Sequence, residues 1–319
     1  MEISMNYDFN KNISLKVSET TPLGDWICQL LKESKFVEST GKGTNNVLTE
    51  LQLNEFQNVK YLRLSNCDLV THLLKTAHEV INLYELNLAF LECLTHICSD
   101  NVERIEFPLL RKMSFYELPE FQNFCPTAIT DSNPLFDEKV SCPNLEYLSI
   151  YHSNISALCS HQLPTDYFTK LQTLEVCDCG KLRNLMSPSV AKGLLNLQWL
   201  EIEHCESMEE VITKGEGIMT LFPRLEHLEL NYLPKLGHFF LTEHALEFPF
   251  LKEVIIYKCP EMKTFVQQGI SVSTPSLESV NYDYEVKVDD LNKWVQQRFS
   301  SQEQEASDGN KAEPSHGRN

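Results

Sequence analysis

The stretch LQTLEVCDC at residues 171–179 decides the fold, because its apolar spacing returns along nearly the whole chain. It recurs as LQWLEIEHC at residues 197–205, in the form L-x-x-L-x-L-x-x-C with Leu sometimes in place of Cys. The first positions of nine copies are Val59, Leu83, Leu110, Leu145, Leu171, Leu197, Leu225, Leu251 and Leu277. The steps between them are 24, 27, 35, 26, 26, 28, 26 and 26 residues. Nearly constant steps of this kind indicate stacked repeats.

The pattern continues beyond the nine quoted residues, which argues against chance agreement. Cys205 is followed at intervals of three by Met208 and Val211, and Leu118 by Phe121 and Phe124. A period of roughly 20 to 29 residues with this framework is typical of a leucine-rich repeat solenoid. We therefore predict an α/β solenoid with a curved parallel sheet on its concave face. Short helices, turns and irregular segments are expected on the convex face.

The repeat weakens toward both ends, as expected for terminal units that cap a stack. Residues 1–55 are predicted to hold degenerate N-terminal repeats, with strands near Ile13 and Phe36 and a helix over 23–34. Residues 56–287 hold about nine repeats, and the long step from Leu110 indicates an insertion near 122–141 that loops out between strands. Helical spacing of apolar residues predicts a capping helix over 288–300. Residues 301–319 lack apolar content and are predicted to be disordered.

Composition and charge exclude several classes of protein. The chain of 319 residues is 42% apolar, yet it holds no apolar run of the roughly 18 residues that a membrane helix requires. Its start has neither a basic nor an apolar stretch of signal-peptide length, so we expect an intracellular location, in the cytoplasm or the nucleus. The formal net charge of −18 argues against nucleic acid as a partner, because phosphate binding needs clustered Lys and Arg.

The eleven cysteines are predicted to be free thiols and not disulfides or zinc ligands. Cys67, Cys179, Cys205 and Cys259 stand at the last framework position, where other repeats place Leu. A residue that exchanges with Leu behaves as a small buried apolar group. Zinc needs convergent ligands, whereas these cysteines are separated by one or more repeats. We expect no metal and no cofactor.

No catalytic motif is recognisable. The Gly-Lys pair at 41–42 lacks the first Gly of a P-loop, and the His, Ser and Asp residues show no spacing that assembles a nucleophile with a base. We therefore expect a protein that is not an enzyme.

The alternation of side chains along each strand predicts a binding surface. The framework apolar residues point into the core, so the three residues around them face the concave side, which solenoids commonly use for binding. These positions form three columns down the stack, and the later repeats combine acidic and aromatic residues as protein interfaces do. We predict that they bind a basic partner segment. The alternative is that they are only the exposed polar positions of the strands, with tyrosines present for their β propensity. The candidate residues are Tyr147, Tyr151, Glu175, Trp199, Glu201, Glu203, His227, Glu229, Glu253, Tyr257 and Asp283.

The repeats resemble a known family. The Phe-Pro openings at 222–223 and 248–249, the segment 171–211 with its Cys-Gly-Lys-Leu and Cys-Glu-Ser-Met stretches, and the ending from Asp290 to Phe299 are the most specific features. Over approximately residues 13–299 the chain is similar to the C-terminal repeats of plant nucleotide-binding leucine-rich repeat disease resistance proteins of the coiled-coil class. The resemblance implies immune surveillance inside the cell. Its implied partners are a pathogen effector, a guarded host protein or the nucleotide-binding domain of such a receptor.

The chain departs from the complete family architecture because it has no P-loop or other nucleotide-switch motif. The resemblance therefore implies ligand sensing or autoinhibitory contact, with the switch outside this chain. One alternative is an intracellular adaptor that recruits a substrate protein, as F-box-type ubiquitin ligase subunits do. An F-box helical bundle before the repeats would identify it, and residues 1–55 do not supply one convincingly. A thiol hydrolase that uses Cys177 is a third alternative.

Overall fold

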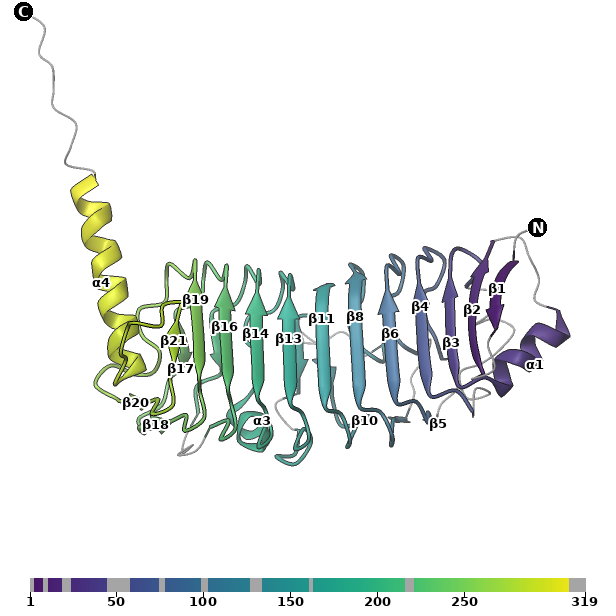
Figure 1. Cartoon of the computed structure of the whole chain (residues 1–319), viewed down its shortest axis with the longest axis horizontal. Coiled ribbons are helices and arrows are strands. Elements are labelled where there is room, and N and C mark those ends of the chain that lie inside the picture. Colours follow the sequence, from purple (N-terminus) through teal and green to yellow (C-terminus); the bar gives the residue numbers. More distant parts are fainter. Residues whose placement is uncertain are drawn as a thin grey trace, which may run out of the picture.

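The computed structural model describes residues 3–7, 11–18, 24–44, 58–74, 78–98, 103–126, 134–160, 163–215 and 221–309. Within these ranges twelve strands form one sheet, in the order β1-β2-β3-β4-β6-β8-β11-β13-β14-β16-β19-β21. β1 pairs antiparallel with β2, and every later neighbour pairs in parallel. Figure 1 shows the strands side by side along the long axis of the molecule. One parallel strand per repeat confirms the predicted leucine-rich repeat solenoid.

The strands of the large sheet have the following bounds: β1 (Ile3–Tyr7), β2 (Asn12–Val17), β3 (Phe36–Thr40), β4 (Tyr61–Ser65), β6 (Glu85–Ala89), β8 (Lys112–Leu118), β11 (Tyr147–Ser153), β13 (Thr173–Cys177), β14 (Trp199–Glu203), β16 (His227–Asn231), β19 (Glu253–Tyr257) and β21 (Ser279–Val280). In β14, Leu200 and Ile202 are fully buried while Trp199, Glu201 and Glu203 are not. The alternation follows from the two-residue period of a strand. It gives the sheet one core side and one side open to solvent, which we call the open face.

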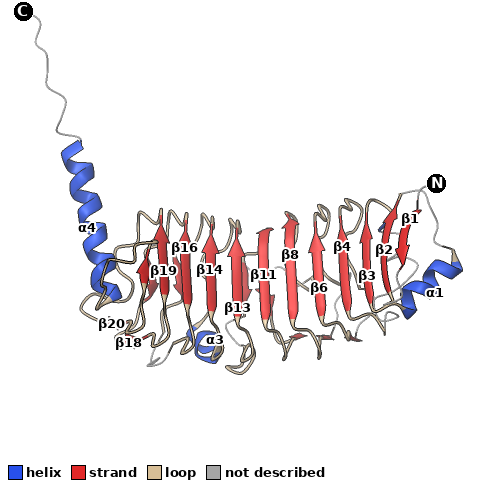
Figure 2. Cartoon of the chain, viewed as in Figure 1, coloured by secondary structure: helices blue, strands red, loops and turns tan. Residues whose placement is uncertain are grey.

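The return segments of the repeats form short strands more often than the predicted helices. These strands are β5 (His78–Val80), β7 (Arg104–Glu106), β9 (Pro134–Phe136), β10 (Val140–Ser141), β12 (Ala157–Cys159), β15 (Glu210–Ile212), β17 (His238–Phe240), β18 (Leu246–Glu247) and β20 (Val272–Ser273). The return segment after β13 holds the helix α3 (Pro188–Gly193), which Figure 2 shows. It forms there because Ser187 accepts a hydrogen bond from the Val190 N–H and Pro188 suits the first helical position. Elsewhere β-branched and aromatic pairs such as Val211-Ile212 and Phe239-Phe240 favour strands.

The core is a continuous column of apolar side chains from the strands, the turns and the return segments. Met208, Val211, Phe121 and Phe124 are all buried, which confirms that the inward pattern continues past the strand. Cys67, Cys179 and Cys205 belong to this column, and the half-buried Cys259 packs against it. Cys205 is fully buried, and its Sγ lies 3.4 Å from the backbone carbonyl of Glu203 as a hydrogen-bond donor. The exchange of Cys for Leu therefore reflects packing, with a weak hydrogen bond added.

The expected insertion near 122–141 is only partly a loop. Residues 127–133 lie outside the described residues. β9 pairs in parallel with β12, and β10 pairs with β7 of the preceding repeat. Leu135, Phe136 and Val140 are buried. The extra residues therefore extend the core on the return side, because their apolar side chains gain more by packing than by exposure.

Helices stand at the two ends of the sheet (Figure 1). α1 (Asp25–Glu33) lies within the predicted 23–34 segment and packs Ile27 and Leu31 into the first repeats. α4 (Leu291–Gly309) begins within the predicted 288–300 cap but runs nine residues into the segment expected to be disordered. Its first turns dock through Leu291 and Val295, and an established helix extends easily through Gln, Glu and Ala. Residues 310–319 lie outside the described residues.

Candidate interaction surface

The register of the large sheet confirms the predicted columns from β4 to β19. The first column over the later repeats runs Thr173, Trp199, His227 and Glu253; the second runs Glu175, Glu201, Glu229 and Ile255; the third runs Cys177, Glu203, Asn231 and Tyr257. In these later repeats, residues 26 to 28 positions apart thus become neighbours on adjacent strands. Five half-buried carboxylates fall within this area, and we call them the acidic face. They are Glu175, Glu201, Glu203, Glu229 and Glu253.

The columns end earlier than predicted. β21 stops at Val280, and Asn281 and Tyr282 both have a left-handed backbone with φ of 50° and 65°. The chain turns there, and the Asp283 carboxylate accepts a hydrogen bond from the Glu285 N–H at 2.9 Å. The placement of Asp283 at the end of the third column is therefore wrong. The apolar framework recurs in the sequence from Leu277, but β21 ends at Val280 and does not reach Asp283.

Aromatic side chains hold the carboxylates of the acidic face in position. Trp199 stacks on His227 with ring centroids 3.6 Å apart and planes 9° apart. Trp199 Nε1 donates to the Glu201 carboxylate at 3.1 Å. His227 Nδ1 lies 3.1 Å from a Glu253 oxygen, and its Nε2 lies 3.2 Å from a Glu229 oxygen. Because each contact needs an N–H, both hydrogen bonds form together when the imidazole carries two protons.

The two candidate tyrosines of β11 border the acidic face. The Tyr147 hydroxyl donates to Glu175 at 2.5 Å. Burial, followed by this hydrogen bond to Glu175, raises the pKa of Tyr147 to about 12, so it stays a neutral donor. Tyr151 stacks on Tyr116 with centroids 4.8 Å apart. At the far side Tyr257 is 47% exposed and lies edge-on to Tyr232.

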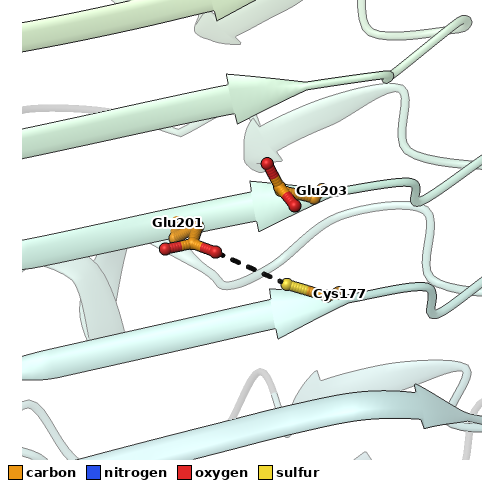
Figure 3. A group of neighbouring side chains, drawn as sticks. All are labelled: Cys177, Glu201 and Glu203. Atoms are coloured by element: carbon orange, nitrogen blue, oxygen red, sulfur yellow. Dashed lines mark hydrogen bonds between the residues drawn. The ribbon is translucent and has the colours of Figure 1, made fainter.

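Cys177 adjoins the acidic face, as Figure 3 shows with Glu201 and Glu203. Its Sγ donates to the Glu201 carboxylate at 3.8 Å, and one ligand atom from each of the three residues lies within 4.8 Å of the others. A thiol acts as a metal ligand or a nucleophile only after it loses its proton. Burial first, and then Glu201 and Glu203, raise the pKa of Cys177 well above its ordinary value. The cluster therefore keeps a protonated thiol and offers little support for hydrolase chemistry.

The acidic face makes the ionised form of one of its carboxylates, Glu201, less favourable in the folded chain. Burial first, and also the charges of Glu229 and Glu175, raise the pKa of Glu201, against the hydrogen bond from Trp199, which lowers it. The folded chain therefore holds that proton more tightly than the unfolded chain does. Ionisation then lowers the free energy of unfolding as the pH rises from the ordinary pKa of 4.5 through the raised value. Below 4.5 this loss is absent.

We expect Glu201→Gln to raise the melting temperature at neutral pH and to give no gain below pH 4.5. Gln keeps an oxygen that accepts the Trp199 hydrogen bond, so the change removes mainly the charge. Thermal unfolding followed by circular dichroism at both pH values measures the difference. Glu206→Gln, on the exposed loop of the same repeat, is the matched control. A lower melting temperature for Glu201→Gln at neutral pH would contradict the expectation.

A fourth column, which the sequence analysis missed, borders the open face. The residue five positions after each first-column residue has a left-handed backbone in nine successive repeats, and we call this set the rim column. Its members are Gly41, Asn66, Phe90, Glu117, His152, Asp178, His204, Tyr232 and Lys258. Their N–H groups continue the ladder, as when His204 N donates to the Asn231 carbonyl at 3.0 Å. Apolar periodicity carries no signal for this position, because its residues are polar, aromatic or Gly.

The rim column lines a groove beside the later strands. His204 and Tyr232 stack with centroids 4.3 Å apart, and Lys258 Nζ lies 4.5 Å from the Tyr232 ring centre. The groove has a volume of about 610 Å³ and is also lined by Pro234 and Pro260. It extends the open face by a row of exposed aromatic and charged groups.

In the described part of the chain, none of the helices has the length and apolar character needed to cross a membrane.

Comparison with known proteins identifies the repeats that carry the acidic face. The family described as plant disease resistance protein RPS2-like, leucine-rich repeats, matches residues 144–282. Over these residues the chain is therefore similar to the leucine-rich repeats of plant disease resistance proteins. The probable disease resistance protein At5g47260 of Arabidopsis thaliana is 29% identical over 141 residues. That match covers 42% of this chain and 14% of the length of the relative. No solved structure gives a significant match.

The residues that this family matches contain every strand of the acidic face, from Glu175 on β13 to Glu253 on β19. The described strands β2 to β8 before them carry mixed charges on the open face. There Lys16, Arg63 and Lys112 alternate with Glu38 and Glu85. Charge of one sign is thus concentrated in the segment that the family comparison covers.

Proposed function

We propose that this chain is a protein-recognition scaffold in plant immunity, and that its acidic face binds a basic segment of a partner protein. The partner is a pathogen effector, a guarded host protein or a nucleotide-binding domain that the repeats hold inactive. The similarity of residues 144–282 to disease resistance repeats supports the immune role. The same similarity does not favour the F-box adaptor alternative.

The observation that carries the proposal is the concentration of five carboxylates on four neighbouring strands, β13, β14, β16 and β19, with Trp199 and Tyr257 exposed beside them. Like charges in register on neighbouring strands repel each other. A partner that brings positive charge removes this repulsion and gains electrostatic steering on approach. The aromatic rings supply apolar contact area, which is where interfaces obtain much of their affinity.

The double substitution Glu201→Lys with Glu229→Lys tests the proposal. We expect it to weaken the binding of the authentic partner at least tenfold, because two attractive contacts become repulsive. Proteins retained from plant extract by the unaltered chain are identified, purified and titrated against each variant at two salt concentrations.

The matched control is Glu247→Lys with Glu261→Lys, which makes the same change of charge at exposed sites away from the acidic face. A partner of the proposed kind binds the control variant normally and loses affinity for the double substitution, most strongly at low salt. If every retained protein binds the two variants equally, the acidic face is not the recognition surface.

A further inference from the structure

The central column of the acidic face is a ladder of three carboxylates. Glu175, Glu201 and Glu229 lie in direct register on β13, β14 and β16. Adjacent strands in a sheet lie about 4.8 Å apart, so the ladder has a pitch of about 4.8 Å and spans about 9.6 Å. This regular spacing of one charge limits the shapes of a complementary partner.

A second, independent observation in the same place also indicates a ligand with N–H donors. Asn231 is 8% exposed, and its amide nitrogen donates to Glu203 at 2.8 Å and to Glu229. These two bonds fix the orientation of the amide. Its Oδ1 is buried and has no hydrogen-bond partner among the described residues. A buried oxygen without a donor is unfavourable, and an ammonium or guanidinium N–H would satisfy it.

The pitch of the ladder discriminates between a helix and a strand as the partner. An α-helix rises 1.5 Å per residue, so side chains at i, i+3 and i+7 on one face are displaced by about 4.5 and about 10.5 Å. These displacements lie within about 1 Å of the ladder. An extended segment repeats on one face about every 6.7 Å, so its third matching residue would be displaced by about 13.4 Å.

The pairing of the strands also favours a helix over an extended segment as the partner. An extended partner gains most of its affinity from main-chain hydrogen bonds with a free sheet edge. β13, β14 and β16 are each paired on both sides, so they offer side chains only. A helix needs no main-chain bonds from its receptor.

We propose that the acidic face binds an amphipathic helix that lies across the strands, with Arg or Lys at i, i+3 and i+7 facing Glu175, Glu201 and Glu229. The proposal rests on the proposed function and specifies the partner's shape. Trp199 in the first column and Tyr257 in the third flank the ladder and contact the apolar residues beside the basic stripe. The cation opposite Glu229 donates to the Asn231 oxygen after a shift of that side chain, because the oxygen is buried in the free chain.

Three synthetic peptides of nearly equal composition test the proposal against the full chain. The first is Ala-rich with Lys at i, i+3 and i+7; the second has the same residues with the Lys distributed around the helix; the third is the first with a central Pro. Fluorescence anisotropy measures binding at low and at physiological salt. Circular dichroism measures the helix formed on binding.

We expect the first peptide to bind at least tenfold more tightly than the other two. This advantage should disappear in Glu201→Gln with Glu229→Gln and persist in Glu247→Gln with Glu261→Gln. If all three peptides bind equally, the acidic face binds positive charge without selecting a helical partner. The helix proposal then fails while the proposed function stands. If none binds, the recognition of basic segments fails as well.

Discussion

Replacing Phe239 with Ala is expected to lower the free energy of unfolding by about 3 to 5 kcal/mol, as for other large aromatic side chains removed from a packed core. Phe239 is fully buried in β17. Its ring stacks on Phe265 of the next repeat at 4.5 Å, and it meets Phe222 and Phe248 edge-on at 6.4 and 6.5 Å. The cavity would open between two repeats, and in a solenoid each repeat is stabilised mainly by its neighbours.

Urea denaturation followed by intrinsic fluorescence measures this loss. The matched control is Phe250→Ala, which removes the same atoms from a side chain that is 55% exposed. We expect the control to change stability by no more than about 0.5 kcal/mol. Equal losses for the two variants would mean that the aromatic column does not hold these repeats together.

Asn292→Ala is expected to have the second large effect, about 3 kcal/mol or more. Asn292 is 1% exposed at the start of α4, and its side chain joins the helix to the last return segment. Its Oδ1 accepts three hydrogen bonds, from Thr264 Oγ1 at 2.8 Å, Phe265 N at 2.9 Å and Val266 N at 3.1 Å. Its amide nitrogen donates two, to Gln267 O at 3.2 Å and Ile270 O at 2.7 Å. Each buried group left without a partner costs about 1 to 3 kcal/mol.

Amide hydrogen exchange identifies where Asn292→Ala acts. We expect protection to fall at residues 265–270 and in the first turns of α4, while β4 to β14 keep theirs, because the effect of a terminal change decays along a stack. Lys293→Ala is the control, since its side chain is 75% exposed. Unchanged protection at Phe265 and Val266 in Asn292→Ala would show that α4 docks by apolar contacts alone.

The sequence predicted those parts of the fold that depend on apolar periodicity. Leu174 and Val176 alternate with Glu175 and Cys177, so the strand, its inward side and its register with β14 all follow from one pattern. Asp283 was misplaced because the pattern continues there after the strand has ended. The return strands at Val211 and Phe239 were expected to be helices or irregular, because segments this short carry no distinguishing period.

The composition of the candidate site followed from the sequence, but its internal contacts did not. Columns place Trp199 beside His227, yet the stacking of their rings depends on side-chain rotamers that no spacing specifies. The buried oxygen of Asn231 likewise depends on the orientation of its amide. Ile255 occupies an outward position in the second column and is nevertheless 2% exposed, which the alternation alone does not predict.

The left-handed backbone of the rim column restricts which substitutions its nine positions can accept. Its nine residues include Asn, Asp, Glu, His, Lys, Phe, Tyr and Gly, and none is Val, Ile, Thr or Pro. Branching at Cβ crowds the carbonyl in this conformation, and proline cannot adopt it. Substitutions among charged, amide and aromatic residues leave the backbone hydrogen bonds of the sheet intact at this position. The border of the sheet can therefore alter its charge and shape over generations with little loss of stability, provided that it avoids the β-branched residues that the strands beside it favour.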